Sequence, residues 1–204
     1  MNFRNFIKQL VPFLRNNMLA FMLVLCLAYM LKHYYSTTSP DDLKWLTSPL
    51  SALIHSLTGI AFTYKAGYGY VNLKHAIGIE KGCVGINYMI AIFAMLSFSF
   101  IPRFPRQIHK LYLIASCALL SYLCTLIVNA LRISTAIALP QTAPLGLSYE
   151  QFHRLQGIAM YFGAMCLLYF ISARIVSKLI HQTSTTIIHP PSRNSLIATP
   201  LLWY

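Results

Sequence analysis

The stretch from Val84 to Ile101 reads VGINYMIAIFAMLSFSFI and contains no charged residue. An uncharged apolar run of about 18 residues or more is typical of a transmembrane helix. It ends at the sequence PRFPR, residues 102–106, and a second apolar run follows over residues 111–131. Prolines and arginines between two such runs indicate a short loop at the membrane surface. The two runs therefore predict a helical hairpin that crosses a bilayer twice.

The composition of the whole chain agrees with a membrane protein. Of its 204 residues, 57% are hydrophobic and 10% are charged, whereas soluble proteins contain roughly 25% charged residues. Two more apolar runs, at about 13–32 and 155–176, complete a set of four expected spans. We therefore predict an all-α membrane fold, a multi-pass bundle of about four to five transmembrane helices. It forms a single domain over residues 1–180, and a flexible cytoplasmic tail follows over residues 181–204.

Residues 49–62 decide between four and five spans. This moderately apolar segment is shorter than the ~20 residues that a helical crossing needs, and it carries polar residues such as His55. We expect an interfacial or re-entrant segment, with a fifth span as the alternative. Farther along, alternating residues at 71–73 and 77–79 predict a short β-hairpin in a small extracytoplasmic loop region.

The net charge of +12 comes from Lys and Arg that lie between the apolar runs. They do not form a basic stripe, so we expect contact with the lipid bilayer and no nucleic-acid partner. The cations gather in three regions: Arg4, Lys8 and Arg15; Arg103, Arg106 and Lys110; and Arg174, Lys178 and Arg193. Since cytoplasmic loops are rich in Lys and Arg, four crossings place all three regions inside. Cys83, Arg132 and His153 then lie near the outer face.

These three residues form a candidate catalytic site. Cys83 lies between glycines where a helix is expected to begin, and helix N-termini favour the thiolate, which is the nucleophilic form. His153 is a candidate general base, with His55 and His75 as alternatives on the same side. Arg132 would stabilise an oxyanion or a bound carbonyl. Taken singly, each has a plainer interpretation, as a tolerated cysteine, a snorkelling arginine or a polar loop histidine.

Four further residues are candidates for substrate binding or support of this site. Asn87 lies four residues after Cys83 and is expected on the same helical face, where it could orient a substrate or a partner helix. Asn129 shares a face with Arg132, Gly85 belongs to the helix start, and Gly157 allows a neighbouring helix to come close. The sequence contains no HExxH, CxxC or P-loop motif, so we expect neither a metal ion nor another cofactor.

The order of these motifs resembles the exosortase/archaeosortase family. The resemblance rests on Cys83-Val84-Gly85 at the start of one span, Asn129-x-x-Arg132-Ile133 at the end of the next, and His153 with Gly157 at the last. It covers about residues 82–157 and is closest to the shorter members. Val84 replaces the serine that is common in the family. The family consists of multi-pass membrane cysteine enzymes.

The resemblance implies a cysteine protease or transpeptidase that forms a thioester. Its partners would be membrane-anchored protein substrates with a C-terminal sorting signal. The expected location is the bacterial cytoplasmic (inner) membrane, with the N-terminus in the cytoplasm and the site at the periplasmic face. One alternative is a non-enzymatic transporter or assembly factor, which would show charges along a path through the spans. Another is a thiol oxidoreductase, which would need a second cysteine beside Cys83.

Overall fold

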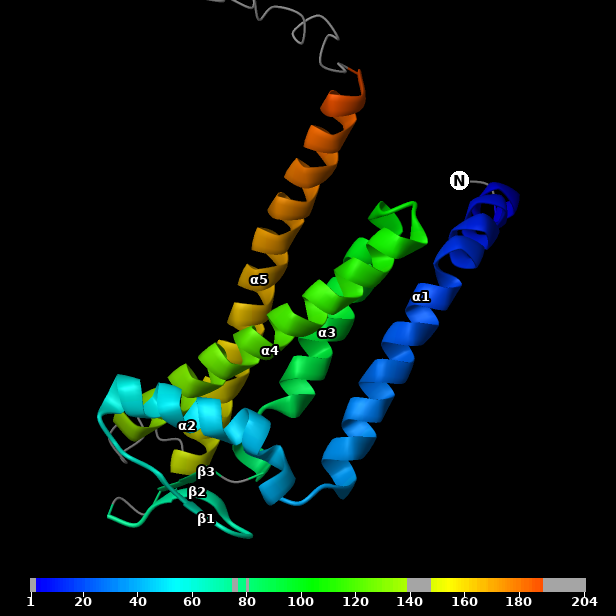
Figure 1. Cartoon of the computed structure of the whole chain (residues 1–204). Helices are drawn as coiled ribbons and strands as arrows, with labels where there is room; N and C mark the ends of the chain where they lie inside the picture. Colours follow the sequence, from blue (N-terminus) through cyan, green and yellow to red (C-terminus); the bar gives the residue numbers. More distant parts are fainter. Residues whose placement is uncertain (1–2, 75–76, 80, 139–147, 189–204) are drawn as a thin grey trace, which may run out of the picture.

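The structure is a computed structural model that describes residues 3–74, 77–79, 81–138 and 148–188. In this part of the chain it contains the helices α1 (Phe3–Thr37), α2 (Lys44–Thr58), α3 (Ile86–Phe100), α4 (Gln107–Ala138) and α5 (Tyr149–Ile188). Figure 1 shows α1, α4 and α5 as long rods, α3 as a shorter helix among them, and α2 as a short helix at one end. Four helical segments are long and apolar enough to cross a membrane. The predicted all-α membrane bundle is thereby confirmed.

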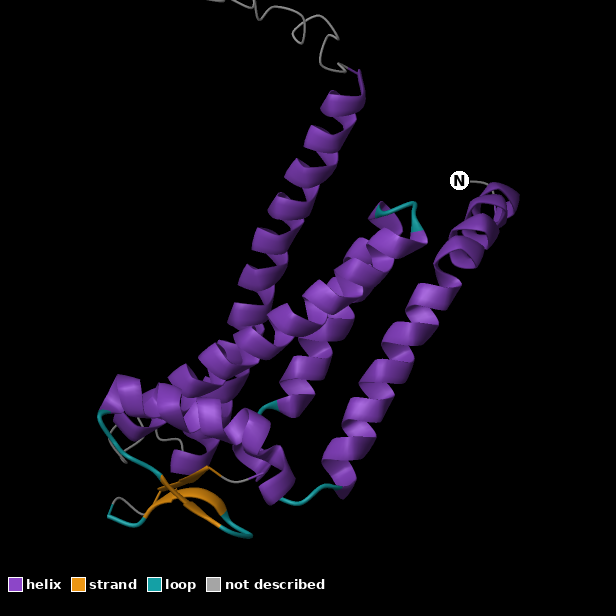
Figure 2. Ribbon diagram, viewed as in Figure 1, coloured by secondary structure: helices purple, strands orange, loops and turns teal. Residues whose placement is uncertain are grey.

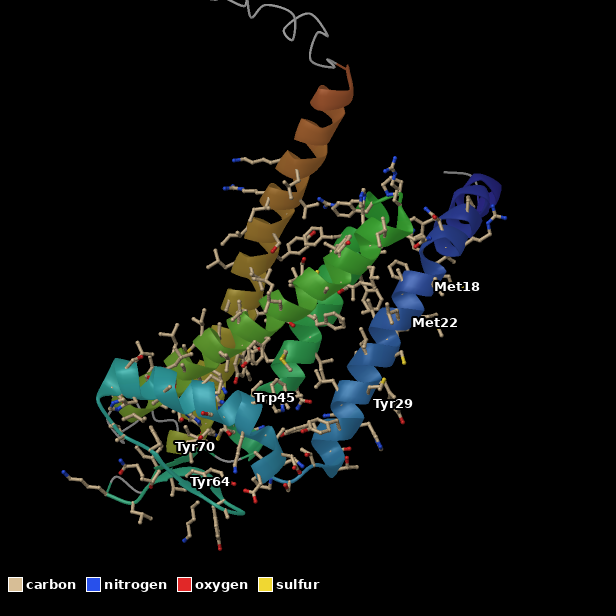
Figure 3. The ribbon with its side chains drawn as sticks, in the orientation of Figure 1. Met18, Met22, Tyr29, Trp45, Tyr64 and Tyr70 are labelled. Atoms are coloured by element: carbon tan, nitrogen blue, oxygen red, sulfur yellow. The ribbon has the colours of Figure 1, made fainter. Side chains whose placement is uncertain are left out.

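The spans match the sequence prediction in number and extend beyond it in length. They are Pro12–Thr37, Lys81–Arg103, Gln107–Ala138 and Gln151–Leu179. The second span, which contains α3, is the central one: 56% of its most apolar window is buried, against 17% for the first span and 6% for the last. Because a lipid-facing side chain is exposed when the protein stands alone, the low values identify α1 and α5 as peripheral helices. On α1, for example, Met18, Met22 and Tyr29 project away from the bundle (Figure 3).

Helix α2 lies across α4 at one end of the bundle (Figure 1). Leu46, Leu50 and Ile54 recur every fourth residue and are fully buried, as expected for the apolar stripe of a packed helix. The hydroxyl of Tyr122 on α4 donates a hydrogen bond to the carbonyl oxygen of Trp45 at 3.0 Å. With 15 residues, α2 is about 22 Å long, which is less than the ~30 Å of a hydrocarbon core. An interfacial position for residues 49–62 stays a prediction.

A small antiparallel sheet follows α2 (Figure 2). Its strands are β1 (Thr63–Lys65), β2 (Gly69–Asn72) and β3 (Ile77–Ile79), in the order β1-β2-β3. Strands β2 and β3 form the predicted hairpin, and β1 adds a third strand that the sequence pattern did not indicate. The carboxylate of Asp41, in the 3₁₀ turn before α2 (Asp41–Leu43), accepts hydrogen bonds from the Tyr64 hydroxyl and from the Gly67 amide at 3.0 Å. These bonds attach the sheet to the start of α2.

The described parts of the three basic regions, which exclude Arg193, lie at one end of the bundle (Figure 1). The start of α1, the turn between α3 and α4 and the far end of α5 lie there, and α2 and the sheet lie at the opposite end. One boundary differs from the expectation. Helix α5 continues to Ile188, so residues 181–188, which we assigned to the tail, are helical, and the flexibility of the tail stays a prediction. The rest of the predicted tail, residues 189–204, is outside the described residues.

Candidate active site

Cys83 ends a short 3₁₀ turn, Lys81–Cys83, that connects β3 to α3. Its side chain is partly exposed. Two hydrogen bonds join this turn to the end of α1. The Tyr35 hydroxyl donates to the Lys81 carbonyl oxygen at 3.0 Å, and Lys81 Nζ donates to the Thr38 carbonyl oxygen at 2.7 Å. The nucleophile candidate therefore sits on an anchored turn before the helix, rather than in the first turn of α3 as we predicted.

Gly85 separates this turn from α3. It adopts a left-handed conformation with φ of 78° and precedes the first helical residue, Ile86. A β-carbon there would lie 3.2 Å from Thr125 Cγ2 and 3.5 Å from Asn129 Nδ2. Glycine is thus favoured twice at this position, because L-residues rarely adopt this φ and because α4 approaches closely. The approach brings Asn129 next to Cys83.

Asn129 is fully buried and is hydrogen-bonded at both ends of its amide. Its Nδ2 donates to the carbonyl oxygen of Cys83, and its Oδ1 accepts a 2.8 Å bond from the hydroxyl of Tyr161. Buried amides are stabilised only when their donors and acceptors are paired. The side chain of Asn129 is therefore locked, and it connects the Cys83 turn to α4 and α5.

Arg132 lies one turn beyond Asn129 on α4 and reaches α5 with two nitrogens. Its Nη1 donates to the Tyr161 hydroxyl at 3.3 Å, and its Nη2 lies 3.4 Å from Nε2 of His153. A guanidinium has donors and no acceptor, so the histidine nitrogen must be the acceptor.

Gly157 provides the space in which Arg132 lies. A β-carbon on this buried glycine would come within 2.9 Å of Arg132 Nε and 3.5 Å of Cζ. We predicted that Gly157 allows close approach of a helix; the structure shows that the approaching group is the guanidinium of Arg132. The Nε donor itself is buried and has no hydrogen-bond partner among the described residues.

Tyr161 joins the site and was not predicted from the sequence. Its hydroxyl contacts both Asn129 and Arg132, and its ring stacks on Tyr88 of α3 with centroids 4.3 Å apart. Tyr161 follows Gly157 by four residues and His153 by eight, so it shares their face of α5. That helical spacing is the signal from which it could have been found.

Asn87, in contrast, does not join the network around Cys83. It is exposed, and its Oδ1 accepts a 2.6 Å hydrogen bond from Nζ of Lys32 on α1. It did not keep the expected helical spacing from Cys83, because α3 begins only at Ile86. We considered that Asn87 could orient a substrate or a partner helix, and its bond to α1 agrees with the second role. Of the alternative bases, His55 is exposed on α2 and His75 is outside the described residues.

The remaining cysteines do not pair with Cys83. All five cysteines of the chain are free. Within the described ranges, no group of three or more His, Cys, Asp or Glu side chains could hold a metal ion. The arrangement joins the turn that carries a thiol to an imidazole and a guanidinium through hydrogen bonds, and these three groups are the parts of a cysteine nucleophile site.

Comparison with known proteins gives one result. A family model described as transmembrane exosortase matches residues 12–170, a range that includes Cys83, Arg132, His153 and Tyr161. Neither the comparison with curated proteins nor that with solved structures gives a match. The matched range covers most of the chain and contains three of the four spans in full and most of the fourth. The chain therefore belongs to the transmembrane exosortase family, a family of sorting transpeptidases in the membrane.

Proposed function

We propose that this protein is a membrane-embedded cysteine protease and transpeptidase that uses Cys83 as its nucleophile. Its substrates would be proteins that carry a C-terminal, membrane-anchored sorting signal. One observation carries the proposal: hydrogen bonds lead without interruption from the Cys83 backbone through Asn129 and Tyr161 to Arg132 and His153. Two helices and a turn, distant in sequence, supply these groups. Family membership agrees with peptide-bond chemistry.

The first step is attack of the Cys83 sulfur on the carbonyl carbon of the scissile peptide. Nε2 of His153 takes the thiol proton, and the carbonyl oxygen gains a negative charge as the carbon becomes tetrahedral. Arg132 stabilises this oxyanion through its N–H donors. Its buried Nε donor lacks a partner among the described residues, so the guanidinium has unused capacity for a substrate oxygen.

The contact between Arg132 and His153 also regulates when the base is available. In the structure His153 Nε2 lies 3.4 Å from Arg132 Nη2, and a nitrogen that accepts a hydrogen bond from the guanidinium does not accept a thiol proton. A substrate carbonyl that draws the guanidinium toward itself frees Nε2 to act as the base. Binding of the substrate would thereby switch on the nucleophile.

The second step breaks the peptide C–N bond. His153 returns its proton to the leaving amine, and the remaining acyl group is held on Cys83 as a thioester. Water or an amine then attacks the thioester carbonyl, and the attacking nucleophile gives up a proton while sulfur recovers one. Hydrolysis releases a shortened protein, whereas an amine gives a transferred one. The atoms and charges balance with no external oxidant or cofactor.

We place this chemistry at the periplasmic face of a bacterial cytoplasmic membrane, with the N-terminus inside. The described parts of the three basic regions lie at the end of the bundle opposite to α2 and the sheet, and the positive-inside rule puts them in the cytoplasm. In a strain whose protein retains Cys83 as its one cysteine, an impermeant thiol reagent should label intact cells from outside. Labelling only after the cytoplasmic side is opened would refute this orientation.

The decisive experiment follows processing of a substrate that carries a C-terminal signal. Cys83→Ala should abolish cleavage while the protein still inserts, and Cys83→Ser should leave at most a trace. Cys26→Ala, at an exposed position on α1, is the matched control and should process normally. Hydroxylamine should release the acyl group from trapped wild-type enzyme. Undiminished processing by Cys83→Ala would disprove the proposal.

A further inference from the structure

A second feature lies at the basic end of the bundle, far from Cys83. A groove of about 920 Å³ runs between α3, α4 and α5. Along α4 it begins near His109, which is about 35 Å from Arg132 at the usual helical rise. Its walls are mainly apolar, and they include Leu96, Phe100, Leu113, Leu120, Ile175 and Val176. The groove therefore suits hydrocarbon chains.

A cluster of basic side chains borders one end of this groove. Arg103, Arg106 and His109 line it and are exposed. The guanidinium of Arg103 lies 5.0 Å above the ring of Phe100, and its Nη1 gives a long 3.5 Å bond to the Ser177 hydroxyl. A guanidinium has five N–H donors, so most of the donors of Arg103 stay available for an anion.

Among the described residues, no acidic side chain lies near this basic rim. The four acids of the chain are Asp41, Asp42, Glu80 and Glu150. Asp41 and Asp42 lie in the 3₁₀ turn before α2, and Glu150 belongs to the first turn of α5, at the opposite end of the bundle. Glu80 is outside the described residues. An anion from another molecule can therefore supply the counter-charge at Arg103 and Arg106.

We propose that this groove is a binding site for an anionic phospholipid. The phosphate would be held by Arg103, Arg106 and His109, and an acyl chain would lie along the apolar walls between α4 and α5. Basic pockets between transmembrane helices on the cytoplasmic side commonly bind such headgroups. A transmembrane helix with a cationic end is a poorer occupant, because the rim would repel it.

Native mass spectrometry of the full-length protein in detergent tests the proposal. Phosphatidylglycerol and phosphatidylcholine with the same acyl chains are the probes. The double variant Arg103→Gln/Arg106→Gln should bind phosphatidylglycerol about thirtyfold more weakly, given about 1 kcal/mol for each basic residue. Phosphatidylcholine should lose less affinity, because its choline cation already neutralises its phosphate. Lys65→Gln/Lys74→Gln removes the same charge from the sheet end and should leave both affinities unchanged.

A second variant tests the apolar part of the site. Ser116 lines the groove and is exposed, so Ser116→Phe fills it without disturbing the core. This variant should lower occupancy by both lipids. If the two charge variants lost the same affinity for phosphatidylglycerol, or if glycerol phosphate competed fully with the lipid, binding would reflect general electrostatic attraction and no specific lipid site. Either result would overturn the proposal. A cross-linker at position 116 that captures a protein helix, and no phospholipid, would overturn it too.

Discussion

The Nε atom of Arg132 lies 2.9 Å from the point that a β-carbon on Gly157 would occupy. A real β-carbon does not come so close to a nitrogen without displacement. The absence of a side chain on α5 is therefore what allows the α4 guanidinium to reach both Tyr161 and His153. This relation connects the glycine of the last span directly to the chemistry of the site.

We expect Gly157→Ala to reduce substrate processing by on the order of a hundredfold, because a displacement of ~1 Å at a catalytic group has this effect. Gly163→Ala is the matched control, since a β-carbon at Gly163 on the same helix meets nothing within 4 Å. Rates measured on a substrate with its sorting signal, normalised to inserted protein, provide the comparison. Equal activity of the two variants would contradict the assigned role of Gly157.

Tyr161→Phe should slow processing by roughly tenfold to a hundredfold, because it removes a hydroxyl that is bonded to a charged group and to Asn129. The ring stack on Tyr88 is retained, so the protein should still insert, and its thermal stability should fall modestly because the buried Oδ1 of Asn129 loses its donor. Since Tyr161 positions Arg132 and does not bind substrate, kcat should fall more than KM rises. Tyr169→Phe, two turns farther along α5, is the control and should leave both constants unchanged.

Gly85→Ala should destabilise the protein by about 1–2 kcal/mol from its left-handed φ alone, and further through the contact with Thr125. Gly59→Ala separates the two effects. Gly59 has a similar φ of 73° but empty surroundings. Thermal unfolding in detergent should rank Gly85→Ala below Gly59→Ala, with Gly82→Ala close to the wild type because its β-carbon would meet nothing. If Gly59→Ala unfolds at a lower temperature than Gly85→Ala, the close approach of α4 to Gly85 does not contribute to stability.

The attachment of the sheet through Asp41 should depend on pH. The Tyr64 hydroxyl and then the Gly67 amide lower the pKa of Asp41 below its usual value of 3.8. The stabilisation is therefore complete above pH ~4 and is lost as the pH falls through the lower, folded-state pKa. Hydrogen exchange at the Gly67 amide should accelerate in that range, beyond the intrinsic pH dependence. Asp41→Asn should abolish this transition, and Asp42→Asn should retain it.

Hydropathy and charge predicted the bundle well, because apolar length and loop cations reflect the membrane directly. The four spans and the common end of Arg132 and His153 follow from these two properties. The exact start of α3 did not follow. Gly85 takes a left-handed conformation, which places Cys83 in a separate turn and breaks the helical spacing on which the expected role of Asn87 depended.

Tyr161 shows a different limit of the sequence. It is one of 13 tyrosines in the chain, and within an apolar span a tyrosine is compatible with lipid contact, core packing or a hydrogen bond. Only the position of α4, which brings Asn129 and Arg132 to the face of α5 that contains His153, identifies its role. The third strand, β1, was missed because all three of its side chains are exposed, so its sequence does not alternate between apolar and polar residues.

Arg132→Lys tests whether geometry or charge matters at the site. Arg132 contacts Tyr161 through Nη1 and His153 through Nη2, and its planar group spans both at once. A lysine ammonium keeps the charge but concentrates its donors at one point, so it can hold only one of the two. We expect a loss of roughly a hundredfold in processing, close to that of Arg132→Ala. Arg154→Lys is the control: Arg154 is exposed and follows His153 in sequence, and this substitution should leave the processing rate unchanged. If lysine restored most of the activity at position 132, the positive charge would suffice, and the switching of His153 by a planar guanidinium would have to be abandoned.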